Sequence, residues 1–357
     1  MIMRERKKIA IIGGGIAGLT FARSLTNEDY EIHIFEKKES FREIGAAISV
    51  FPNALCVIDD LDLLEEILQN SGQFKTVYLK TSKGKVLSKS EPKSDYPVIC
   101  IHRADLDNGQ ITIQFENGEN RVFDAVIGAD GIHSEVRKHI INDGEPIFRG
   151  YSIWRGVVKT NFEIGYGSET YGIGKRVGIV PIKDGVYGWW ATCNETYMQD
   201  DSPEGTKDKL KRLFGDWHHP IPDLMNNTEV ILKNSLIDRK PHKGWSRGNA
   251  ILLGDAAHPT TPNLGQGGCM AIEGAYILAK SIQKYGLTKK AFDRYENLQY
   301  PRSENIVNTS LKLGKMGQIT NPLLIRLRNF AFKAMPSSVA MKMIDKYFSY
   351  RVTNIEI

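Results

Sequence analysis

Cysteine is scarce in this chain of 357 residues, and its four copies lie far apart, at Cys56, Cys100, Cys193 and Cys269. No two of them form a C-x-x-C pair, so the pattern indicates neither a zinc site nor a disulfide framework. We therefore predict no metal site, and we expect a reducing compartment.

Long apolar runs are also missing. No stretch approaches the roughly 20 apolar residues that a membrane-spanning helix needs. The basic start, MIMRERKK, leads into an ordinary strand pattern and not into the apolar core and cleavage site of a signal peptide. These absences favour a cytoplasmic protein without an integral membrane segment.

A strong excess of one charge is the third absence. The net charge of +5 comes from 47 basic and 42 acidic residues, and no basic run dominates. Such a balance does not favour a nucleic-acid partner. Composition is that of an ordinary globular protein, and the length suffices for two domains in a monomer or homodimer.

A glycine-rich turn follows the first apolar run, residues 8–12. Gly13, Gly15 and Gly18 fit G-x-G-x-x-G and open a stretch with helical spacing. Residues 31–35 are then expected as a strand, with Glu36 at its end. This order of parts is the dinucleotide fingerprint and predicts nucleotide binding. The alternative is a turn that only shapes a loop.

Two further strand-to-helix turns occur along the chain. Residues 128–137 (GADGIHSEVR) follow a strand expected at 121–127, and Ser134 is a plausible helix N-cap. Residues 248–274 combine a short strand, Asp255 at its end, and a glycine-rich entry into a helix. Three such turns suit one extended cofactor held by discontinuous segments.

The segment 151–245 has a different character. It alternates in strand fashion, and four of the five tryptophans, Trp154, Trp189, Trp190 and Trp217, fall between residues 151 and 220. We expect an antiparallel sheet whose tryptophans are mostly core, with one or two as a lining for a planar apolar substrate. A hairpin is expected within residues 74–87, and another around Asn117-Gly118.

Helices are expected at the C-terminal end. Residues 292–306 read as a charged helix interrupted by Pro301, and residues 311–347 as helices broken at Pro322 and Pro336. This tail is a docking helix, a dimer contact or a membrane-surface helix, and docking is the favoured interpretation.

Together the motifs resemble the single-component FAD-dependent aromatic hydroxylases, which include the para-hydroxybenzoate, salicylate and urate hydroxylases and zeaxanthin epoxidase. The resemblance runs from residue 8 to about residue 310. Residues 45–53 and 154–156 are most similar to the urate hydroxylase and zeaxanthin epoxidase branch. The resemblance implies an α/β fold with a Rossmann-like FAD-binding domain that contains a parallel sheet. A substrate domain with a mixed or antiparallel β-sheet is interleaved with it, and C-terminal helices follow.

The resemblance also implies domain boundaries and site residues. The FAD-binding domain would comprise residues 1–70, 100–150 and 246–310, the substrate domain 71–99 and 151–245, and the helical segment 311–357. The expected cofactor-binding residues are Gly13, Gly15, Ala17, Gly18, Glu36, Lys37, Ser49, Arg103, Asp130, Asp255, Gly265, Gln266, Gly267, Gly268 and Cys269.

Particular roles follow from that resemblance. Glu36 would bind the adenosine ribose, Arg103 and Asp255 the ribityl–phosphate part, and residues 265–269 the pyrimidine end of the flavin. Asp130 would serve both FAD and NAD(P)H. Arg176 is the expected catalytic residue beside flavin and substrate, and the alternative for it is an exposed strand cation.

The implied activity is that of a monooxygenase. NADH or NADPH reduces FAD, O2 gives a flavin hydroperoxide, and one oxygen hydroxylates or epoxidises an aromatic, heteroaromatic or polyene-like small molecule. A flavin-dependent reductase on the same fold is an alternative. His258 is a possible base, although shaping the loop ahead of Pro259 is favoured.

One departure from the family pattern is evident. Leu106 meets Asp107-Asn108-Gly109 almost at once, so the usual helix and strand before residue 111 are missing. Such a crossover needs at least about 10 residues. This predicts either a truncated adenine pocket or a deletion form that binds a ligand with weakened FAD binding and no turnover.

Overall fold

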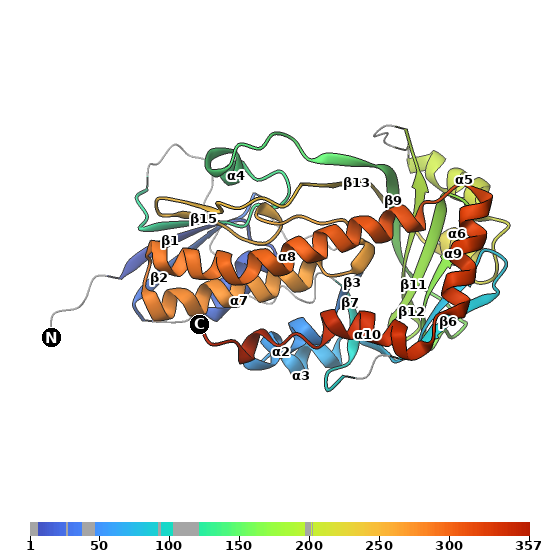
Figure 1. Cartoon of the computed structure of the whole chain (residues 1–357), viewed down its shortest axis with the longest axis horizontal. Helices are drawn as coiled ribbons and strands as arrows, with labels where there is room; N and C mark the ends of the chain where they lie inside the picture. The colour runs from blue at the N-terminus through green and yellow to red at the C-terminus, as the bar shows by residue number, and fades with distance from the viewer. Residues whose placement is uncertain are drawn as a thin grey trace.

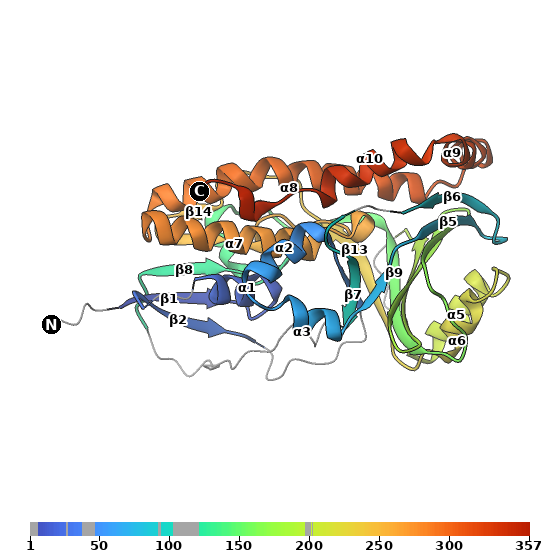
Figure 2. The ribbon, with the colours of Figure 1, turned by 90° about the horizontal axis from the view of Figure 1, so that it is seen from below.

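Two large sheets, one toward each end of an elongated molecule, organise the chain (Figure 1). The computed structural model describes residues 6–25, 28–37, 47–91, 94–102, 121–196, 201 and 203–357. Long helices run between the two sheets and cover the first of them (Figure 2). The arrangement confirms the predicted α/β fold with a parallel sheet, a separate mostly antiparallel sheet and C-terminal helices.

The first sheet has the strand order β14-β15-β8-β1-β2. Its strands are β1 (Lys7–Ile12), β2 (Tyr30–Phe35), β8 (Ala125–Gly128), β14 (Ser246–Arg247) and β15 (Ala250–Leu252). All pairings are parallel except that of β14 with β15. Ile9 and Ile11 of the interior strand β1 are fully buried, as expected for a parallel sheet covered on both faces.

The strand expected at residues 121–127 begins only at Ala125, so that boundary was wrong. Asp124 lies where the sheet ends and pairs with Lys8 twice. Its carboxylate accepts a hydrogen bond from the Lys8 N–H at 2.7 Å, and its own N–H donates to the Lys8 carbonyl. The Asp124 side chain here accepts the hydrogen bond that a strand carbonyl would otherwise accept, so the regular pairing of the two strands ends at this point.

The helices that cover this sheet are α1 (Ile16–Ser24), α7 (Gly267–Tyr285) and α8 (Lys289–Gly317). Phe21 of α1 and Leu25, the residue that caps its end, are fully buried in the same core as Ile277 of α7. Three short helices lie around them: α2 (Pro52–Asp60), α3 (Leu64–Gln69) and α4 (Glu135–Ile140). Pro52 opens α2, because its missing N–H falls where a helix has no partner for it.

Pro301 does not interrupt α8, contrary to the sequence prediction. The helix is 29 residues long and runs without a break on both sides of Pro301. Proline costs a helix one backbone hydrogen bond and a steric clash. Here Tyr295, Gln299 and Ile306 bury the face of α8 on both sides of Pro301, and packing of a helix face outweighs propensity.

The second sheet has the order β13-β9-β12-β11-β10-β5-β6, antiparallel except where β5 pairs with β10. Its strands are β5 (Val77–Thr81), β6 (Val86–Ser90), β9 (Ile147–Lys159), β10 (Gly167–Tyr171), β11 (Lys175–Lys183), β12 (Val186–Asn194) and β13 (Ile231–Asp238). The hairpin expected within residues 74–87 is confirmed, and a second tight turn joins β11 to β12.

The two faces of this sheet have different neighbours. The outer face packs against α5 (Pro203–Phe214) and α6 (Ile221–Asn227). Trp154, Trp189 and Trp217 are buried in that core, which confirms the structural role expected for most tryptophans. The inner face approaches a small sheet of β3 (Ala47–Val50), β7 (Val98–His102) and β4 (Gly72–Phe74), in the order β3-β7-β4.

The C-terminal residues form α9 (Pro322–Ala334), α10 (Ser337–Phe348) and the 3-10 turn η4 (Val352–Asn354). The predicted breaks are confirmed, since Pro322 begins α9 and Pro336 precedes α10. The end of the chain docks on the molecule. Phe348 lies 4.6 Å from Phe51 between ring centroids, and Val352 is fully buried.

A buried ion pair holds α7, α8 and the chain end together. Glu273 of α7 is fully buried, and Arg302 of α8 donates to its two oxygens at 2.6 and 2.7 Å. The guanidinium lies 3.8 Å from the centre of the Tyr350 ring. Burial raises the pKa of Glu273, and Arg302 opposes that rise.

Removing one partner of this pair should be costly. We expect Arg302→Met to lower the free energy of unfolding by roughly 3–5 kcal/mol, because it leaves the Glu273 carboxylate buried without its counter-charge. The double variant Arg302→Met/Glu273→Gln should regain part of that loss. Urea denaturation measures both, and Lys289→Met, at an exposed pair with Asp293, is a near-neutral control. Equal losses in the single and double variants would show that packing, not charge, matters.

Candidate active site

The turn between β1 and α1 gives each of its glycines a distinct geometry. Gly13 has φ +107°, and a Cβ built on it would lie 2.4 Å from the Ala129 carbonyl oxygen. A Cβ on Gly18 would lie 2.2 Å from the Gly13 oxygen, whereas one on Gly15 would meet no described atom within 4 Å. The turn thus has a tight corner, a close helix–strand contact and, at Gly15, open space beside the backbone.

Glu36 ends β2 directly beside this turn. Its carboxylate accepts a hydrogen bond from the Gly14 N–H at 2.8 Å, across 22 residues of sequence. Lys37, which follows it, is exposed. The acid that the fingerprint places at the second strand therefore lies at the glycine turn.

The three glycine-rich segments meet at the carboxyl ends of β1, β8 and β15. Gly13 touches Ala129 of the second motif, as described above. Gly254 of the third motif (φ +62°) faces α1, because a Cβ built on it would lie 2.7 Å from the Ala17 Cβ. Ligands of open α/β sheets bind in the crevice at this edge.

Asp255 lies in the 3-10 turn η2 (Gly254–Ala256) that follows β15. It is exposed, whereas every other residue from 251 to 259 is buried. The fold therefore presents this one carboxylate at the surface of the crevice, as a group that can accept hydrogen bonds from a polyol.

The N-terminus of α7 follows the turn η3 (Pro262–Leu264) and Gly265, which has φ +69°. The first hydrogen bond of the helix runs from the Met270 N–H to the Gln266 carbonyl at 2.9 Å. The N–H groups of residues 267–269 precede it and have no helical partner. No acidic side chain occupies this first turn, so the end of the helix suits negative charge.

Buried polar atoms without partners lie at the same helix end. Asn53 donates to the Gln266 Oε1 at 2.9 Å and to Glu273 at 2.7 Å. Within the described residues, the Asn53 Oδ1 and the Gln266 Nε2 are buried and have no hydrogen-bond partner. A polar ring bound here would meet both a donor and an acceptor, which is the pattern of a flavin pyrimidine edge. The sequence alone gave Asn53 no role in the site.

Cys269 and Ser49 flank this helix end. Burial raises the pKa of the Cys269 thiol to about 12, so only its backbone N–H is suited to bind an anion. Ser49 lies on β3 next to Ile48, whose side chain would lie 2.8 Å from a Cβ built on Gly268. β3 and the start of α7 are therefore direct neighbours.

Asp130 is bound to α4. Its carboxylate accepts hydrogen bonds from the Ser134 hydroxyl and from the N–H groups of Glu135 and Val136, at 2.8 and 3.2 Å. Ser134 itself accepts from the Arg137 N–H, which confirms it as the N-cap. These bonds hold the second motif in place beside the first.

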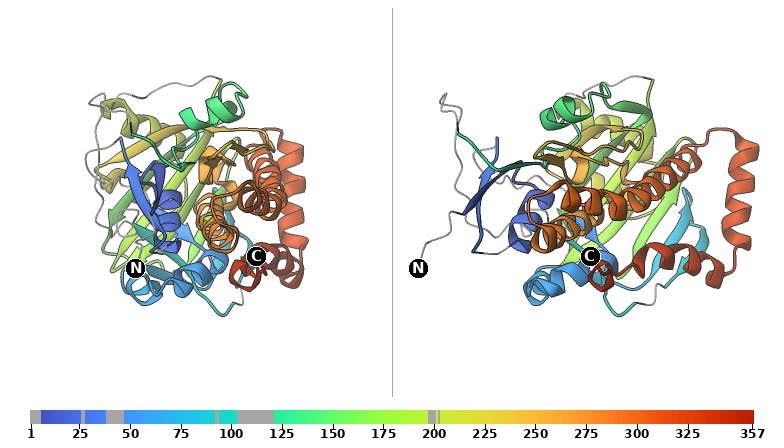
Figure 3. Two further views of the ribbon diagram at one scale, coloured as in Figure 1. Left: turned by 90° about the vertical axis from the view of Figure 1, so that its left-hand side faces the viewer. Right: turned by 60° about the vertical axis from the view of Figure 1, so that its left-hand side comes forward.

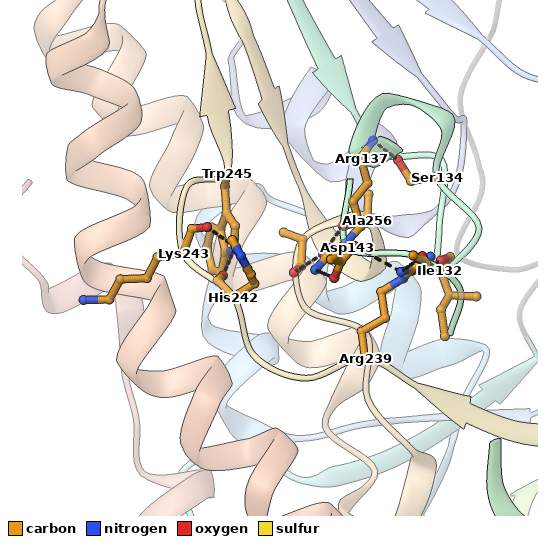
Figure 4. A network of polar contacts seen from close by, with 11 residues as sticks. Ile132, Ser134, Arg137, Asp143, Arg239, His242, Lys243, Trp245 and Ala256 are labelled. Carbon is orange, nitrogen blue, oxygen red and sulfur yellow. Dashed lines mark hydrogen bonds and ion pairs between the residues drawn. The ribbon is translucent and has the colours of Figure 1, made fainter. Parts of the chain in front are cut away.

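Arg137 connects the second motif to the third (Figure 4). It is buried and donates from Nη1 to the carbonyls of Ala256 and Ala257, both at 2.8 Å. Its Nε and Nη2 donate to the two oxygens of Asp143 at 2.9 and 2.7 Å. Sequence reasoning gave Arg137 no role, and its place in the second motif was the only available signal.

Arg239 completes this network from the far side. It donates to the Asp143 carboxylate at 3.1 Å and to the Ile132 carbonyl at 3.2 Å (Figure 4). Burial acts to raise the pKa of Asp143, but the hydrogen bonds and charge of Arg137, with the charge of Arg239, outweigh it and lower that pKa. The carboxylate therefore stays ionised between two arginines.

His258 is buried next to Trp245, with 5.4 Å between the ring centroids. Neither ring nitrogen has a hydrogen-bond partner within the described residues. Burial, with a smaller contribution from Arg137, lowers its pKa to about 4. This supports the favoured interpretation of His258 as a loop-shaping residue over that of a base.

Arg176 lies on β11, in the second sheet, and is only 3% exposed. The alternative of an exposed strand cation was therefore wrong. It pairs with Glu169 at 2.8 Å, and it donates to the Asn263 side chain of η3, in the cofactor loop. Burial acts to lower the pKa of Arg176, and Glu169 raises it above its usual value. The roles of Glu169 and Asn263 were not predicted from the sequence, since only the fold brings them next to Arg176.

Trp190 and Gly178 share the inner face of the second sheet with Arg176. Trp190 pairs with Gly178 across β11 and β12, and a Cβ on Gly178 would lie only 1.9 Å from the indole. The ring therefore lies over the glycine backbone and is half-buried. Trp190 differs in this from the three tryptophans in the outer core.

Several predictions for the site and its surroundings lie outside the described residues. They concern Arg103, the hairpin around Asn117-Gly118 and the missing crossover after Leu106. In the described part of the sheet, β2 is the edge strand.

Comparisons with known proteins identify the class. Residues 99–310, more than half of the chain, match the family described as "FAD binding domain", and residues 11–46 match "NAD(P)-binding Rossmann-like domain". The chain belongs to this FAD-binding family. Within it, the protein is an FAD-dependent monooxygenase, an oxidoreductase that uses NAD(P)H, which confirms the resemblance drawn from the motifs.

Three relatives illustrate the similarity. Aurachin C monooxygenase/isomerase of Stigmatella aurantiaca is 32% identical, over 94% of this chain and 96% of its own. 6-Hydroxynicotinate 3-monooxygenase of Pseudomonas fluorescens is 26% identical, over 86% and 91%. The structure of Klebsiella pneumoniae HpxO with FAD and uric acid has a TM-score of 0.87 at 21% identity, over 97% of both chains. Within the described residues, no helix has the length and apolar character to span a bilayer.

Two glycine variants should separate cofactor binding from folding. We expect Gly15→Ala to leave the stability of the apoprotein unchanged but to weaken FAD binding about tenfold or more, because its methyl group occupies the space open to the cofactor. Gly18→Ala should lower apoprotein stability by roughly 1–3 kcal/mol, since its methyl group overlaps the Gly13 carbonyl. Urea denaturation and FAD fluorescence titration measure the two effects. Unchanged FAD affinity in Gly15→Ala would contradict the assignment of the open space at Gly15 to bound FAD.

His258 should make stability depend on pH. Its pKa in the fold is about 4, below the usual 6.5, so the unfolded chain binds a proton first as the pH falls. The free energy of unfolding should therefore drop between pH 6.5 and 4, by roughly 3 kcal/mol from this residue. His258→Leu should remove that part of the slope. Parallel slopes for the two proteins in urea denaturation across this range would refute the assignment.

Proposed function

We propose that this monooxygenase hydroxylates or epoxidises an aromatic, heteroaromatic or polyene-like small molecule. The substrate would lie between the N-terminus of α7 and the inner face of the second sheet. The observation that carries the proposal is the half-buried Trp190 ring, which lies over Gly178 on the face that also holds Arg176. A planar apolar face beside one buried cation suits a flat ring with a polar substituent.

The residues at the crevice fit FAD. Gly13, Gly15, Ala17 and Gly18 would face its pyrophosphate, with Glu36 and Lys37 at the adenosine end. Asp255 would bind the ribityl chain, supported by its exposure in an otherwise buried run. Arg103 is proposed for the same part from the family resemblance alone. Bound FAD would supply electron transfer from NAD(P)H and the activation of O2.

The start of α7 would bind the pyrimidine end of the ring. Gly265 provides the left-handed turn, and residues 267–269 present their N–H groups. Gln266 and Asn53 would complete the polar contacts through the two buried atoms that lack partners. Ser49 would contact the ring from β3. N–H groups at a helix N-terminus stabilise negative charge, which favours the reduced form of the ring.

Arg176 would position the substrate. Its Nε is buried without a hydrogen-bond partner in the described part of the chain, while its other nitrogens are held by Glu169 and Asn263. A guanidinium fixed in this way can bind an oxygen of the substrate with little loss of entropy. Asp130 would act on the cofactors mainly by holding the second motif, since its carboxylate already accepts three hydrogen bonds.

The names of the relatives support this substrate class. They include monooxygenases named for a hydroxynicotinate and an aminohydroxybenzoate, zeaxanthin epoxidases and, among the solved structures, a salicylate hydroxylase. We propose that the chain works in the cytoplasm, as a monomer or homodimer, and uses O2 as its second substrate. The domain boundaries inferred from the sequence are part of the same proposal.

A substrate screen tests the activity. The purified protein should be yellow, and a true substrate should accelerate NAD(P)H oxidation and O2 uptake together, with label from ¹⁸O₂ in the product. Trp190→Ala should raise KM for that substrate about tenfold or more while FAD affinity stays unchanged, because the indole would face the substrate and is not among the residues proposed to bind FAD. Trp217→Phe, in the outer core, is the matched control.

Two results would change the assignment. Substrate-stimulated flavin reduction without label in the product would identify a reductase. A colourless protein that takes up no FAD would indicate the ligand-binding alternative, in which the short segment after Leu106 abolishes cofactor binding.

A further inference from the structure

The helices α9 and α10 carry most of the large exposed apolar side chains among the described residues. We refer to residues 322–348 as the α9–α10 arm. Of the ten large apolar side chains exposed in the described part of the chain, six belong to it: Leu323, Leu324, Leu327, Phe330, Val339 and Met343. The right-hand view of Figure 3 shows α9 at the extreme edge of the molecule.

The exposed residues of α9 form one face of the helix. Leu323, Leu327 and Phe330, at positions i, i+4 and i+7, are 71%, 63% and 69% exposed. The other face is docked, since Arg328 and Phe332 lie against the Tyr171 ring of β10, at 4.9 and 5.4 Å. The helix is thus anchored on one side and presents a contiguous apolar stripe on the other.

Positive charge is concentrated around this stripe. Residues 311–357 contain eight lysines and arginines and two acidic residues, a net charge of +6, whereas the whole chain carries +5. No acidic residue occurs between Glu304 and Asp345. The cations exposed here are Lys312, Lys315, Arg326, Lys333, Lys342 and Lys346. The net positive charge of the protein therefore comes entirely from the C-terminal segment that carries this exposed apolar face.

We propose that the α9–α10 arm binds the surface of an anionic phospholipid bilayer. Leucine and phenylalanine would enter the boundary between headgroups and acyl chains, and the surrounding lysines and arginines would contact the phosphates. A second copy of the chain is a poorer partner, because two arms, each with a net charge of +4, repel each other. The helices are too short to span the bilayer and suit its interface.

The arm lies close to the proposed substrate region. An open apolar groove of about 280 Å³ lies between the end of α8 and α9, with Leu324, Leu327 and Phe332 in its lining. From Tyr171, beneath α9, one hydrogen bond leads to Glu169, which pairs with Arg176. Resting on the proposed function, this points to an apolar substrate that partitions into membranes.

Vesicle binding tests the proposal. The purified full-length protein should co-sediment with phosphatidylcholine vesicles that contain phosphatidylserine and not with pure phosphatidylcholine vesicles. High salt should weaken this binding, since it screens charge. The assay needs neither NAD(P)H nor substrate, so its outcome is independent of the proposed activity.

Matched variants locate the binding surface. Arg326→Glu/Lys333→Glu and Leu327→Asn/Phe330→Asn should each weaken binding roughly tenfold or more, through charge and apolar contact respectively. The controls are Lys211→Glu/Arg212→Glu, an equal charge change on exposed residues of α5, and Val230→Asn at another exposed apolar site. Both controls should bind like the wild type.

Three outcomes would overturn the proposal. The first is equal binding to both vesicle types, and the second is an equal loss of binding in the α5 control. The third combines two observations: the wild type binds no vesicles, and analytical ultracentrifugation shows a dimer that Leu327→Asn/Phe330→Asn converts to a monomer. That result would assign the stripe to contact with a second copy of the chain.

Discussion

The buried guanidinium of Arg137 holds together two segments that lie about 120 residues apart in the sequence. Its bonds to the carbonyls of Ala256 and Ala257 fix the loop that carries Asp255 relative to the turn that carries Asp130. A buried arginine is stable only when its donors are satisfied and its charge is compensated, and Asp143 provides that compensation. The crevice at the ends of β1, β8 and β15 depends on this network, because three short turns have no core of their own.

A second buried arginine performs the corresponding task between the two sheets. Arg176 is fixed by Glu169 on its own sheet and reaches Asn263 in the loop that leads into α7. Asn263 in turn donates to the Tyr151 hydroxyl of β9 and to the Ser310 carbonyl of α8. A displacement of the loop would therefore disturb β9, β11 and α8 together, so the position of the α7 N-terminus is coupled to the substrate side of the molecule.

Local sequence was sufficient for features whose cause is local. The glycines at 13, 15 and 18, the N-cap Ser134 and the helix breaks at Pro322 and Pro336 were predictable, because backbone geometry or missing N–H groups demand those residue types. The predictions that failed depend on distant partners. Whether Arg176 is buried is decided by Glu169 and Asn263, and the continuity of α8 through Pro301 is decided by packing. Asn53 and Arg137 gave no local signal, since their hydrogen-bond partners are brought near only by the fold.

The uneven distribution of charge also makes the molecule an electric dipole. With +6 on residues 311–357, the remaining 310 residues carry a net charge of −1. An anionic surface attracts one end of such a molecule and weakly repels the rest, and this torque acts over about one Debye length, ~8–10 Å in physiological salt. The protein would therefore rotate before it touches the surface. Its first collision would be oriented, with α9 leading and the nucleotide-binding sheet trailing.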